Sequence, residues 1–553
     1  MTSNGWLQIA FFIFILLIFV KPLGTYIANV YQGHPTFLSR WLSPFEILLY
    51  RVCNINSQIE MNWKQYLRAI LVLNLIGVIT VYLFQRFQWY LPYNPESLAN
   101  LSPDLAFNTA ASFVTNTDWQ AYRGESTLSY LTQCSALTVQ NFLSAATGMA
   151  VLMAFIRGLA RHATEDLGNF WVDLVRGILY ILLPLSFIFA LLLNAQGVIQ
   201  NFKPYEKMTP LETQQTTVKI PMGPVASQVA IKQLGSNGGG FFNTSSAHPF
   251  ENPTPLSNFL ELIAIVLIPA ALCYTFGILV KDKRQGWAIF IAMLLILIPI
   301  LVADVLIESR NITSMEGKET RIGVVNSAMW SVATTATSNG STNAMLDSFT
   351  PLGGLIPLWL MQLGEIVFGG LGSGLYGMII YIILTVFIAG LMVGRTPEYL
   401  GKKIEPFEMK MTLLVVLLMP ITVLILTSIA VVTSVAPNSI GNTGSHGFTE
   451  ILYAITSMGN NNGSSFDGIN ANLPFYNIAG GLEMLIMRFG VMIAVLALAG
   501  SFVRKKVIPQ TLGTLCTFSP LFIILLIAVI MMLGALTFFP ALLLGPIVEH
   551  LMH

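Results

Sequence analysis

Charged residues are scarce in this sequence. Of its 553 residues only 10% are Asp, Glu, Lys or Arg, whereas 54% are hydrophobic. A soluble domain carries roughly 25% charged residues, so the composition excludes an ordinary soluble protein. It indicates an all-α polytopic membrane protein that lies in a lipid bilayer. The formal net charge is +1, and without a basic patch no nucleic-acid partner is expected.

Cysteine and nucleotide-binding motifs are also lacking. The four cysteines have no CxxC or CxxH spacing, so we expect small buried hydrophobic side chains and no metal or redox role. They are Cys53, Cys134, Cys273 and Cys516. Neither a GxxxxGKS/T loop nor an Asp-Lys-Thr-Gly phosphorylation sequence is present. Because the segments between hydrophobic runs are also too short for a nucleotide-binding domain, we expect no ATP to bind this chain.

Ten hydrophobic runs are long enough to cross a bilayer, which takes about 20 apolar residues. They cover residues 6–26, 66–88, 130–156, 172–196, 257–281, 287–307, 370–393, 412–434, 480–501 and 517–541. The first run has no positively charged segment before it and no small-residue cleavage site after it. It is therefore predicted to be a span and not a signal peptide.

Basic residues alternate between the two sides of these spans. Lys and Arg cluster after the odd-numbered spans, for example at Lys281, Lys283 and Arg284, while residues 435–480 contain neither. Because cytoplasmic loops carry the excess of Lys and Arg, both termini are predicted to lie outside. The segment 197–256 carries several lysines and departs from the pattern, but long translocated loops obey this rule only weakly.

Four short polar loops lie between long hydrophobic runs, all on the predicted outer side. Each follows a dozen or so small, apolar and hydroxyl residues that suit a short helix, as in residues 324–337. The loops are Asn116-Thr117-Asp118, Ser236-Asn237-Gly238, Ser338-Asn339-Gly340 and Asn461-Asn462-Gly463. A span, a short helix, a glycine-bearing loop and a second span are the layout of a cation-channel pore repeat. Four such repeats in one chain would close a pore around one axis.

This layout divides the chain into six parts. They are the first transmembrane helix with a cytoplasmic loop (1–60), four pseudo-symmetric pore repeats (61–165, 166–285, 286–410 and 411–505) and the last transmembrane helix (506–553). A single cluster of Gly, Asn and Ser is also typical of an ordinary turn. Four clusters in register favour the pore.

The composition of the loops suits a bare cation. Successive backbone carbonyls can replace the water shell of a potassium ion. Lining them up requires alternating conformations with positive φ, which glycine and asparagine reach readily. The first loop has Asp118 in the glycine place, where we expect added negative charge at the mouth, and Gln120 would place an amide oxygen nearby. The alternative for both residues is a solvated loop with an Asp-based turn.

The loops and the ten spans closely resemble the potassium-binding A subunit of the bacterial Kdp potassium-uptake ATPase. The resemblance runs essentially end to end and rests on residues 115–120 (TNTDWQ), 237–243 (NGGGFFN) and 458–464 (MGNNNGS). It implies a multi-pass protein of the bacterial inner membrane that binds outside potassium, its substrate, in a four-loop selectivity filter. Asp118 departs from the family pattern, which would have asparagine there.

The resemblance also implies partners. A P-type ATPase catalytic subunit would hydrolyse ATP on another chain, and accessory single-span subunits would accompany the pair. This chain would then be the non-catalytic, ion-selecting subunit of a high-affinity potassium uptake pump. The alternative is an autonomous potassium channel or an ion-coupled potassium symporter with the same pore.

Charges within the spans are further candidates. Arg488 lies in the ninth span, and by the resemblance it faces the cavity below the filter, where its charge would block leak and couple the ion to the pumping subunit. The alternative is a structural ion pair, with Glu483 nearby, or a hydrogen bond to a broken helix. Six glycines within residues 364–377 predict either a gating break or close helix packing. Asp304 and Glu365 lie near predicted span ends and are expected to be solvated or paired.

Overall fold

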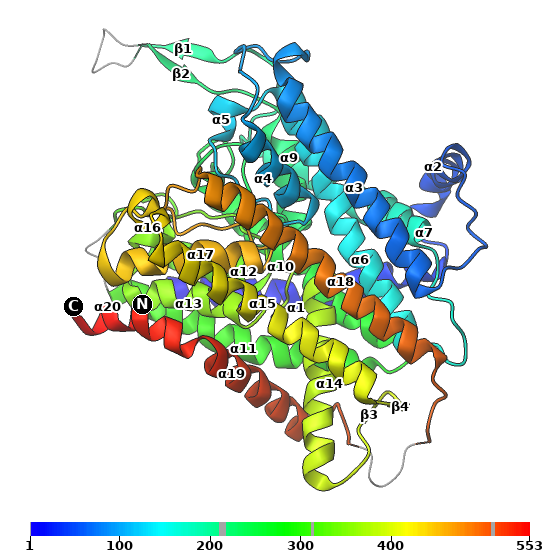
Figure 1. Cartoon of the computed structure of the whole chain (residues 1–553). Coiled ribbons are helices and arrows are strands. Elements are labelled where there is room, and N and C mark those ends of the chain that lie inside the picture. The colour runs from blue at the N-terminus through cyan, green and yellow to red at the C-terminus, as the bar shows by residue number, and fades with distance from the viewer. Residues whose placement is uncertain (1, 210–216, 311–314, 510–514, 553) are drawn as a thin grey trace.

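The structure is a computed structural model that describes residues 2–209, 217–310, 315–509 and 515–552. Within these residues ten helical stretches are long and apolar enough to cross a membrane, and they pack into one bundle (Figure 1). Each overlaps one of the ten predicted runs, which confirms the all-α polytopic fold. An even number of spans leaves both termini on the same side, and Figure 1 shows both ends at one edge of the bundle.

Several spans combine more than one helical segment. The spans are α1 (Ser3–Gln32), α3 (Trp63–Phe87) with η1 (Gln88–Tyr90), η2 (Thr132–Thr138) with α6 (Val139–Ala160), α7 (Phe170–Arg176) with η3 (Gly177–Leu182) and α8 (Leu183–Ala195), α10 (Pro255–Leu279), α11 (Lys283–Arg310), α14 (Ser373–Val393), α15 (Pro406–Val432), η6 (Tyr476–Gly480) with α18 (Gly481–Arg504), and α19 (Pro520–Leu542) with η7 (Leu543–Ile547) and α20 (Val548–Met552).

Short elements complete the chain. They are α2 (Ser39–Val52), α5 (Gly124–Thr127), η4 (Ser245–Ala247), η5 (Leu346–Ser348), α13 (Pro351–Gln362), α16 (Val435–Ser439), the antiparallel strands β1 (Glu206–Met208) and β2 (Val218–Ile220), and the antiparallel strands β3 (Glu398–Tyr399) and β4 (Lys402–Lys403). In the first hairpin Glu206 pairs with Ile220, and in the second Glu398 pairs with Lys403. The first hairpin projects from the bundle in Figure 1.

Four more helices are too short to span a membrane, and each leads into one of the four predicted loops. They are α4 (Pro103–Val114), α9 (Val225–Leu234), α12 (Val324–Ala336) and α17 (Gly444–Gly459). Small residues such as Ala110 in α4 and Ala333 in α12 are fully buried. Because small side chains let neighbouring backbones approach closely, these short helices pack among the spans.

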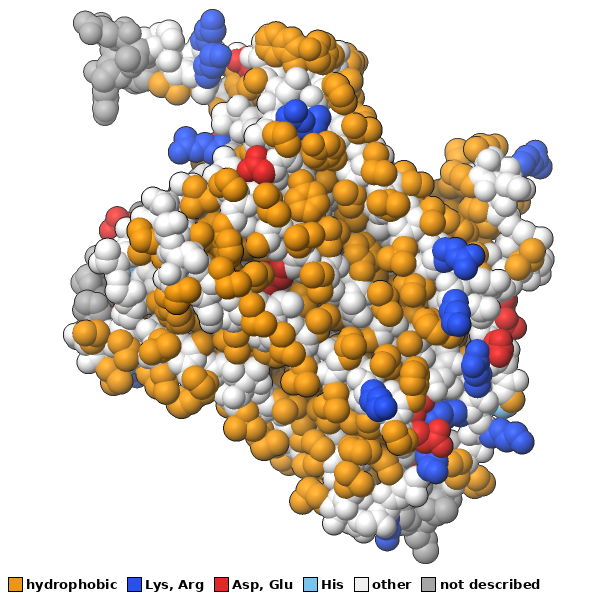
Figure 2. Space-filling model, viewed as in Figure 1, with side chains coloured by type: hydrophobic (Ala, Val, Ile, Leu, Met, Phe, Trp, Pro, Cys, Tyr) orange, Lys and Arg blue, Asp and Glu red, His pale blue; other side chains and the backbone are white. Residues whose placement is uncertain are grey.

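The outer surface of the bundle fits a lipid environment. Leu75 of α3 and Leu536 of α19 are 61% and 72% exposed, and hydrophobic side chains cover much of the face in Figure 2. Lys and Arg gather towards the edges of that face. Monomeric soluble proteins rarely expose apolar patches of this extent, so the chain is a multi-pass membrane protein.

Two expectations about the connections change. The predicted repeat boundaries at 285/286 and 410/411 fall inside α11 and α15, because both helices begin in the charged segments before their apolar runs. Cys53 and Cys516 are exposed and not buried, because each lies in a connection outside the helices. Cys273, in the middle of α10, is buried as predicted.

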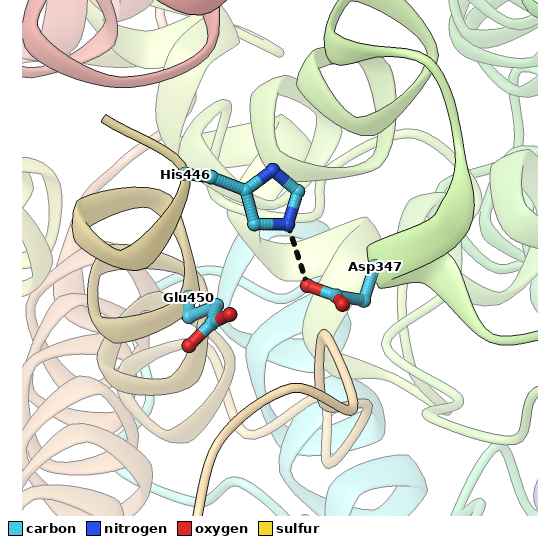
Figure 3. Close-up of side chains that lie close together, drawn as sticks. All are labelled: Asp347, His446 and Glu450. Atoms are coloured by element: carbon cyan, nitrogen blue, oxygen red, sulfur yellow. Dashed lines mark hydrogen bonds and ion pairs between the residues drawn. The ribbon is translucent and has the colours of Figure 1, made fainter. Parts of the chain in front are cut away.

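An ion-pair clasp centred on His446 fastens the C-terminal segment to the last short helix. Figure 3 shows the side of this clasp formed with Asp347, with Glu450 nearby. His446, in the first turn of α17, bonds Asp347 of η5 through Nε2 and Glu549 of α20 through Nδ1, both at 2.7 Å. Ligand-type atoms of Asp347, His446 and Glu450 lie within 4.8 Å of one another. Existing bonds already occupy both ring nitrogens, and Glu450 accepts two backbone N–H groups of the preceding loop. The cluster therefore serves as a clasp.

The clasp predicts a pH-dependent stability. Hydrogen bonds that protonated His446 donates to Asp347 and Glu549 raise the pKa of His446 from 6.5 to about 10. Its charge then stabilises the fold fully below about pH 6.5 and loses that effect as the pH rises through about 10. In thermal unfolding we expect His446→Gln to melt about 1–2 °C below the wild type at pH 6 and to approach it at pH 10.5. An equal gap at both pH values would contradict the clasp.

Candidate functional site

The four predicted loops share one backbone conformation. In each loop the first and third residues have positive φ, and the middle residue does not. The values are +65° and +51° at Asn116 and Asp118, +46° and +72° at Ser236 and Gly238, +57° and +90° at Ser338 and Gly340, and +57° and +97° at Asn461 and Gly463. This alternation is the pattern expected for carbonyls that line up along one side of the chain.

The same hydrogen bond ties each loop to the short helix before it. The backbone N–H of the middle residue donates to the carbonyl five residues earlier, in the last turns of α4, α9, α12 and α17. The pairs are Thr117 to Ser112 (3.0 Å), and Asn237 to Lys232, Asn339 to Thr334 and Asn462 to Ser457 (2.9 Å each). The C-terminal end of a helix carries partial negative charge, so four negative helix ends meet the four loops.

The loops form a closed ring. In three of them the glycine lies so close to the next loop that an added Cβ atom would overlap the carbonyl oxygen of its middle residue. The contacts are Gly238 with Asn339, Gly340 with Asn462, and Gly463 with Thr117. The circle closes between the first and second loops, where Asn116 Nδ2 donates to the Ser236 carbonyl at 2.7 Å. We call these four loops the ring.

Amide and hydroxyl side chains brace the ring across its boundaries. The bonds are Asn237 Nδ2 to Asn116 Oδ1 (2.6 Å), and Asn339 Nδ2 to the Lys232 carbonyl, Asn462 Nδ2 to the Thr334 carbonyl, Asn461 Nδ2 to Thr117 Oγ1 and Ser338 Oγ to the Asn461 carbonyl (3.0 Å each). The expectation for asparagine changes accordingly. In the three Asn-Gly pairs only the glycine has positive φ, and the asparagine is a brace.

Asp118 differs from the glycines in the same place. It is fully buried, so the alternative of a solvated turn is wrong for this residue. Its Oδ2 lies 3.0 Å from the side-chain amide of Asn141 in α6, which donates when its NH₂ group faces the acceptors. Its Oδ1 has no hydrogen-bond partner among the described residues. One quarter of the ring thus holds a buried carboxylate.

Gln120 straps the first loop to the second. Its Oε1 accepts the backbone N–H of Gly240 at 2.8 Å, and its Nε2 donates to the Gly240 carbonyl at 3.1 Å. Nε2 also donates to the Tyr122 hydroxyl at 3.1 Å. The amide oxygen expected at the mouth is therefore already engaged by the neighbouring loop.

A buried ion pair behind the second loop escaped the sequence analysis. Lys232 and Glu251 have no exposed side-chain surface and form an ion pair. Lys232 Nζ also donates to the Gly239 carbonyl at 3.2 Å, next to Gly238 of the ring. Removing one partner of a buried pair costs about 3–5 kcal/mol, so this pair holds the second loop firmly. The sequence offers one signal for this pair: Lys232 is the only charged residue of the segment that forms α9.

A small cavity of about 100 Å³ adjoins the ring. Ser338 and Asn461 of the ring line it together with Glu365 and Arg488. Arg488 is 7% exposed and donates Nη2 to the Ser144 carbonyl of α6 at 3.3 Å. It forms no ion pair with any carboxylate in the described ranges, so the alternative of a pair with Glu483 is wrong.

Glu365 and Asp304 are both buried, so of the two expected states, solvated or paired, the solvated one is wrong. Glu365 accepts a hydrogen bond from Asn462 Nδ2 of the ring at 2.7 Å, and Asp304 accepts one from Ser331 Oγ of α12 at 2.7 Å. Both carboxylates therefore support the short helices and loops from behind. Residues near the ends of the predicted apolar runs are thus also buried by helix packing around the ring.

The glycine-rich stretch interrupts the helical structure between α13 and α14 and also packs closely against a neighbouring helix. Residues 363–372 connect α13 to α14 without a helix, and Gly364, Glu365, Phe368 and Gly372 have positive φ. A Cβ atom on Gly372 would overlap the carbonyl of Gly148 in α6. The break thus lies against α6 and, through Glu365, beside the cavity.

Comparison with known proteins places this architecture in a family. The potassium-transporting ATPase A subunit family matches residues 10–551. The potassium-transporting ATPase potassium-binding subunit of Sorangium cellulosum (strain So ce56) is 57% identical over 576 residues, covering 100% of this chain and 99% of the relative. The subunit of the same description from Methylococcus capsulatus (strain ATCC 33009 / NCIMB 11132 / Bath) is 55% identical over 591 residues, with coverage of 100% and 99%.

A solved structure shares the fold. The crystal structure of the potassium transporter TrkH from Vibrio parahaemolyticus matches with a TM-score of 0.53 and 14% identity, covering 88% of this chain and 99% of that chain. This likeness concerns the fold alone. On the family match and the relatives, this chain belongs to the potassium-transporting ATPase A subunit family.

Proposed function

We propose that the ring is a potassium selectivity filter, and that this chain is the ion-selecting subunit of an ATP-driven potassium uptake pump. The alternating φ of all four loops carries the proposal, since it lines up successive carbonyls, whose oxygens can replace the water around a bare cation. The filter residues are Asn116, Thr117, Asp118, Gln120, Ser236, Asn237, Gly238, Ser338, Asn339, Gly340, Asn461, Asn462 and Gly463. The four helix ends add negative potential at the same place.

The names of the relatives support a wider assembly. Those names describe the potassium-binding subunit of a potassium-transporting ATPase. A P-type ATPase catalytic subunit with accessory single-span subunits is the partner that such a subunit requires, and it, not this chain, binds ATP. The distribution of Lys and Arg supports placing the ring on the outer side of a bacterial inner membrane, with both termini outside.

Two charges shape the path of the ion in this proposal. The buried carboxylate of Asp118 strengthens cation binding in one quarter of the ring. The guanidinium of Arg488, in the cavity beside the ring, repels an ion that leaves straight downwards and directs it towards the pumping subunit. The break at residues 363–372 is the segment best placed to gate this cavity.

Ion uptake into liposomes tests the function. Rubidium or potassium uptake is measured with this chain alone and with its co-expressed partners, each with and without ATP. Uptake only with partners and ATP is the expected result. Flux through the chain alone would replace the pump subunit with a channel or carrier.

Gly340→Ala tests the ring. An L-residue pays about 1–2 kcal/mol at this φ, and the added Cβ would overlap the Asn462 carbonyl. We expect potassium-over-sodium preference in uptake to fall about tenfold. The matched control is Gly394→Ala, because Gly394 has φ +71° with open space around it and lies after α14, away from the ring. Equal selectivity of the two variants would remove this loop from the filter.

Asp118→Asn tests the buried carboxylate. Burial raises the pKa of Asp118, but a cation bound in the ring favours its ionised form. A unit charge roughly 10 Å from the ion then contributes about 1.7 kcal/mol at an effective dielectric constant of about 20, which is about tenfold in affinity. We therefore expect half-maximal potassium stimulation of the complex's ATPase at about tenfold higher potassium. Asp104→Asn, at the far end of α4, is the control and should leave it unchanged. An unaltered or tighter apparent affinity in Asp118→Asn would show that the carboxylate adds nothing to binding.

Arg488→Ala tests the barrier. Removing a positive charge from the cavity lowers the energy of an ion there by about 3 kcal/mol at a separation of roughly 5 Å, so ATP-independent rubidium leak should rise at least about tenfold. Arg488→Lys should keep the barrier. The control is Arg504→Ala, since Arg504 ends the same helix and, within the described residues, forms an exposed ion pair with Glu165. Tight coupling in Arg488→Ala would assign this arginine a structural role.

A further inference from the structure

Two cavities meet at the basic ends of the spans, at the opposite end of α6 from the ring. One has a volume of about 570 Å³ and lies between the C-terminal ends of α1, α6 and α10 and the start of α7. The other, about 330 Å³, continues beneath α2. His34 and Arg176 line both cavities and therefore mark their junction. By the distribution of Lys and Arg, this is the cytoplasmic side.

Positive charge in these cavities is only partly neutralised. Arg157 is held by Asp173 through two hydrogen bonds (2.5 and 2.7 Å) and Arg161 by Glu60 through two more (2.7 and 2.9 Å). These pairs leave no net charge. The net charge of the cavities therefore depends on the other charged side chains that line them.

Arg176 and Lys281 have hydrogen-bond donors that could still bind an anion. Arg176 binds Glu46 through Nε at 3.0 Å, and a guanidinium has five N–H donors. The ammonium group of Lys281 has no hydrogen-bond or ion-pair partner among the described residues, although the residue lines the larger cavity. The paired walls and these two residues leave an excess positive charge, which calls for an anionic occupant.

The roof of the smaller cavity is an amphipathic helix. One face of α2 and its approach carries large apolar side chains at spacings of three and four residues, each more than half exposed: Phe37, Trp41, Phe45, Leu48 and Val52. The opposite face carries Ser39, Ser43 and Glu46, which line the cavity. Figure 1 shows α2 at the edge of the bundle, beyond α7. Such a helix lies in the membrane interface with its apolar face among the acyl chains.

We propose that the joined cavities bind the phosphate-bearing headgroup of an anionic phospholipid. The phosphate lies at the junction between Arg176 and Lys281, with the headgroup under the polar face of α2. The acyl chains run outwards along the apolar face of α2. Basic pockets between spans on the cytoplasmic side are the type of site that recognises anionic headgroups. The occupant would fix α2 to α1, α7 and α10.

The experiment measures lipid-dependent stability of the full chain, which does not depend on potassium transport. The purified protein is melted while phosphatidylglycerol, phosphatidylcholine or inorganic phosphate is titrated in. We expect phosphatidylglycerol alone to raise the melting temperature. Because one lysine near an anionic lipid surface accounts for about a fivefold change in affinity, Lys281→Gln should need about fivefold more phosphatidylglycerol for half the effect.

The chain provides a matched control. Lys283, two residues further on, is exposed and does not line either cavity, so Lys283→Gln should respond like the wild type. Arg176→Lys, which keeps the charge facing Glu46 but loses the guanidinium fork, should also need more lipid. An identical response of all variants, or an equal effect of phosphatidylcholine, would overturn the site. An equal effect of inorganic phosphate would assign it to a soluble phosphate compound and overturn the lipid.

Discussion

The contact between a glycine of one loop and a carbonyl of the next is the constraint on which the ring depends. Gly238, Gly340 and Gly463 each lie where a Cβ atom would overlap the neighbouring loop. The four loops can therefore lie this close together because these three positions have no side chain. The same three positions limit the size of the space that the loops enclose. The positive φ at the same positions is a second reason for glycine, so conformation and contact select the same residue.

Inside a membrane such a ring must also satisfy its own backbone, since irregular backbone is tolerated only where it is packed in protein or lines a cavity. Here the N–H groups of the middle residues turn back to the short helices, and side-chain amides bind carbonyls of adjacent repeats. The donors are thus used up by the protein itself, whereas the loop carbonyls keep acceptor capacity for a cation.

The first junction breaks the symmetry of the ring. Between the first and second loops, polar side chains take the place of the glycine contact. Asn116 donates to the Ser236 carbonyl, and Gln120 accepts a hydrogen bond from the Gly240 N–H and donates one to the Gly240 carbonyl. Asp118 brings a carboxylate on one side of this junction, and Lys232 with Glu251 brings an ion pair on the other. In the proposed filter, a ring with one side-chain-braced quarter would hold an ion at unequal distances, which suits binding better than rapid passage.

Much of this architecture could be predicted from the sequence, because its strongest signals are local. Apolar length predicted the ten spans, and the clusters of Asn, Ser and Gly located the loops and the positive φ of their glycines. The positive φ at the first residue of each loop was not predicted, because the sequence pattern assigned it to the asparagine before the glycine. The rest depends on contacts between residues far apart in the chain, such as Arg488 with Ser144 and Glu365 with Asn462. Periodicity does not encode these pairs. Buried charges such as Lys232 were also missed, because a lysine near a loop looks solvated until its partner is known.

If the ring is the proposed filter, the cavity beside it gives a physical reason for a pore that does not conduct freely. An ion in the ring faces four negative helix ends. One step further it meets Arg488, which lacks a carboxylate partner among the described residues, while Glu365 is engaged by Asn462. Two like charges roughly 5 Å apart repel by about 3 kcal/mol at an effective dielectric constant of about 20. In the proposed filter the ion would therefore be attracted to the ring and repelled from the cavity, so that onward movement would require free energy that the ring itself does not supply.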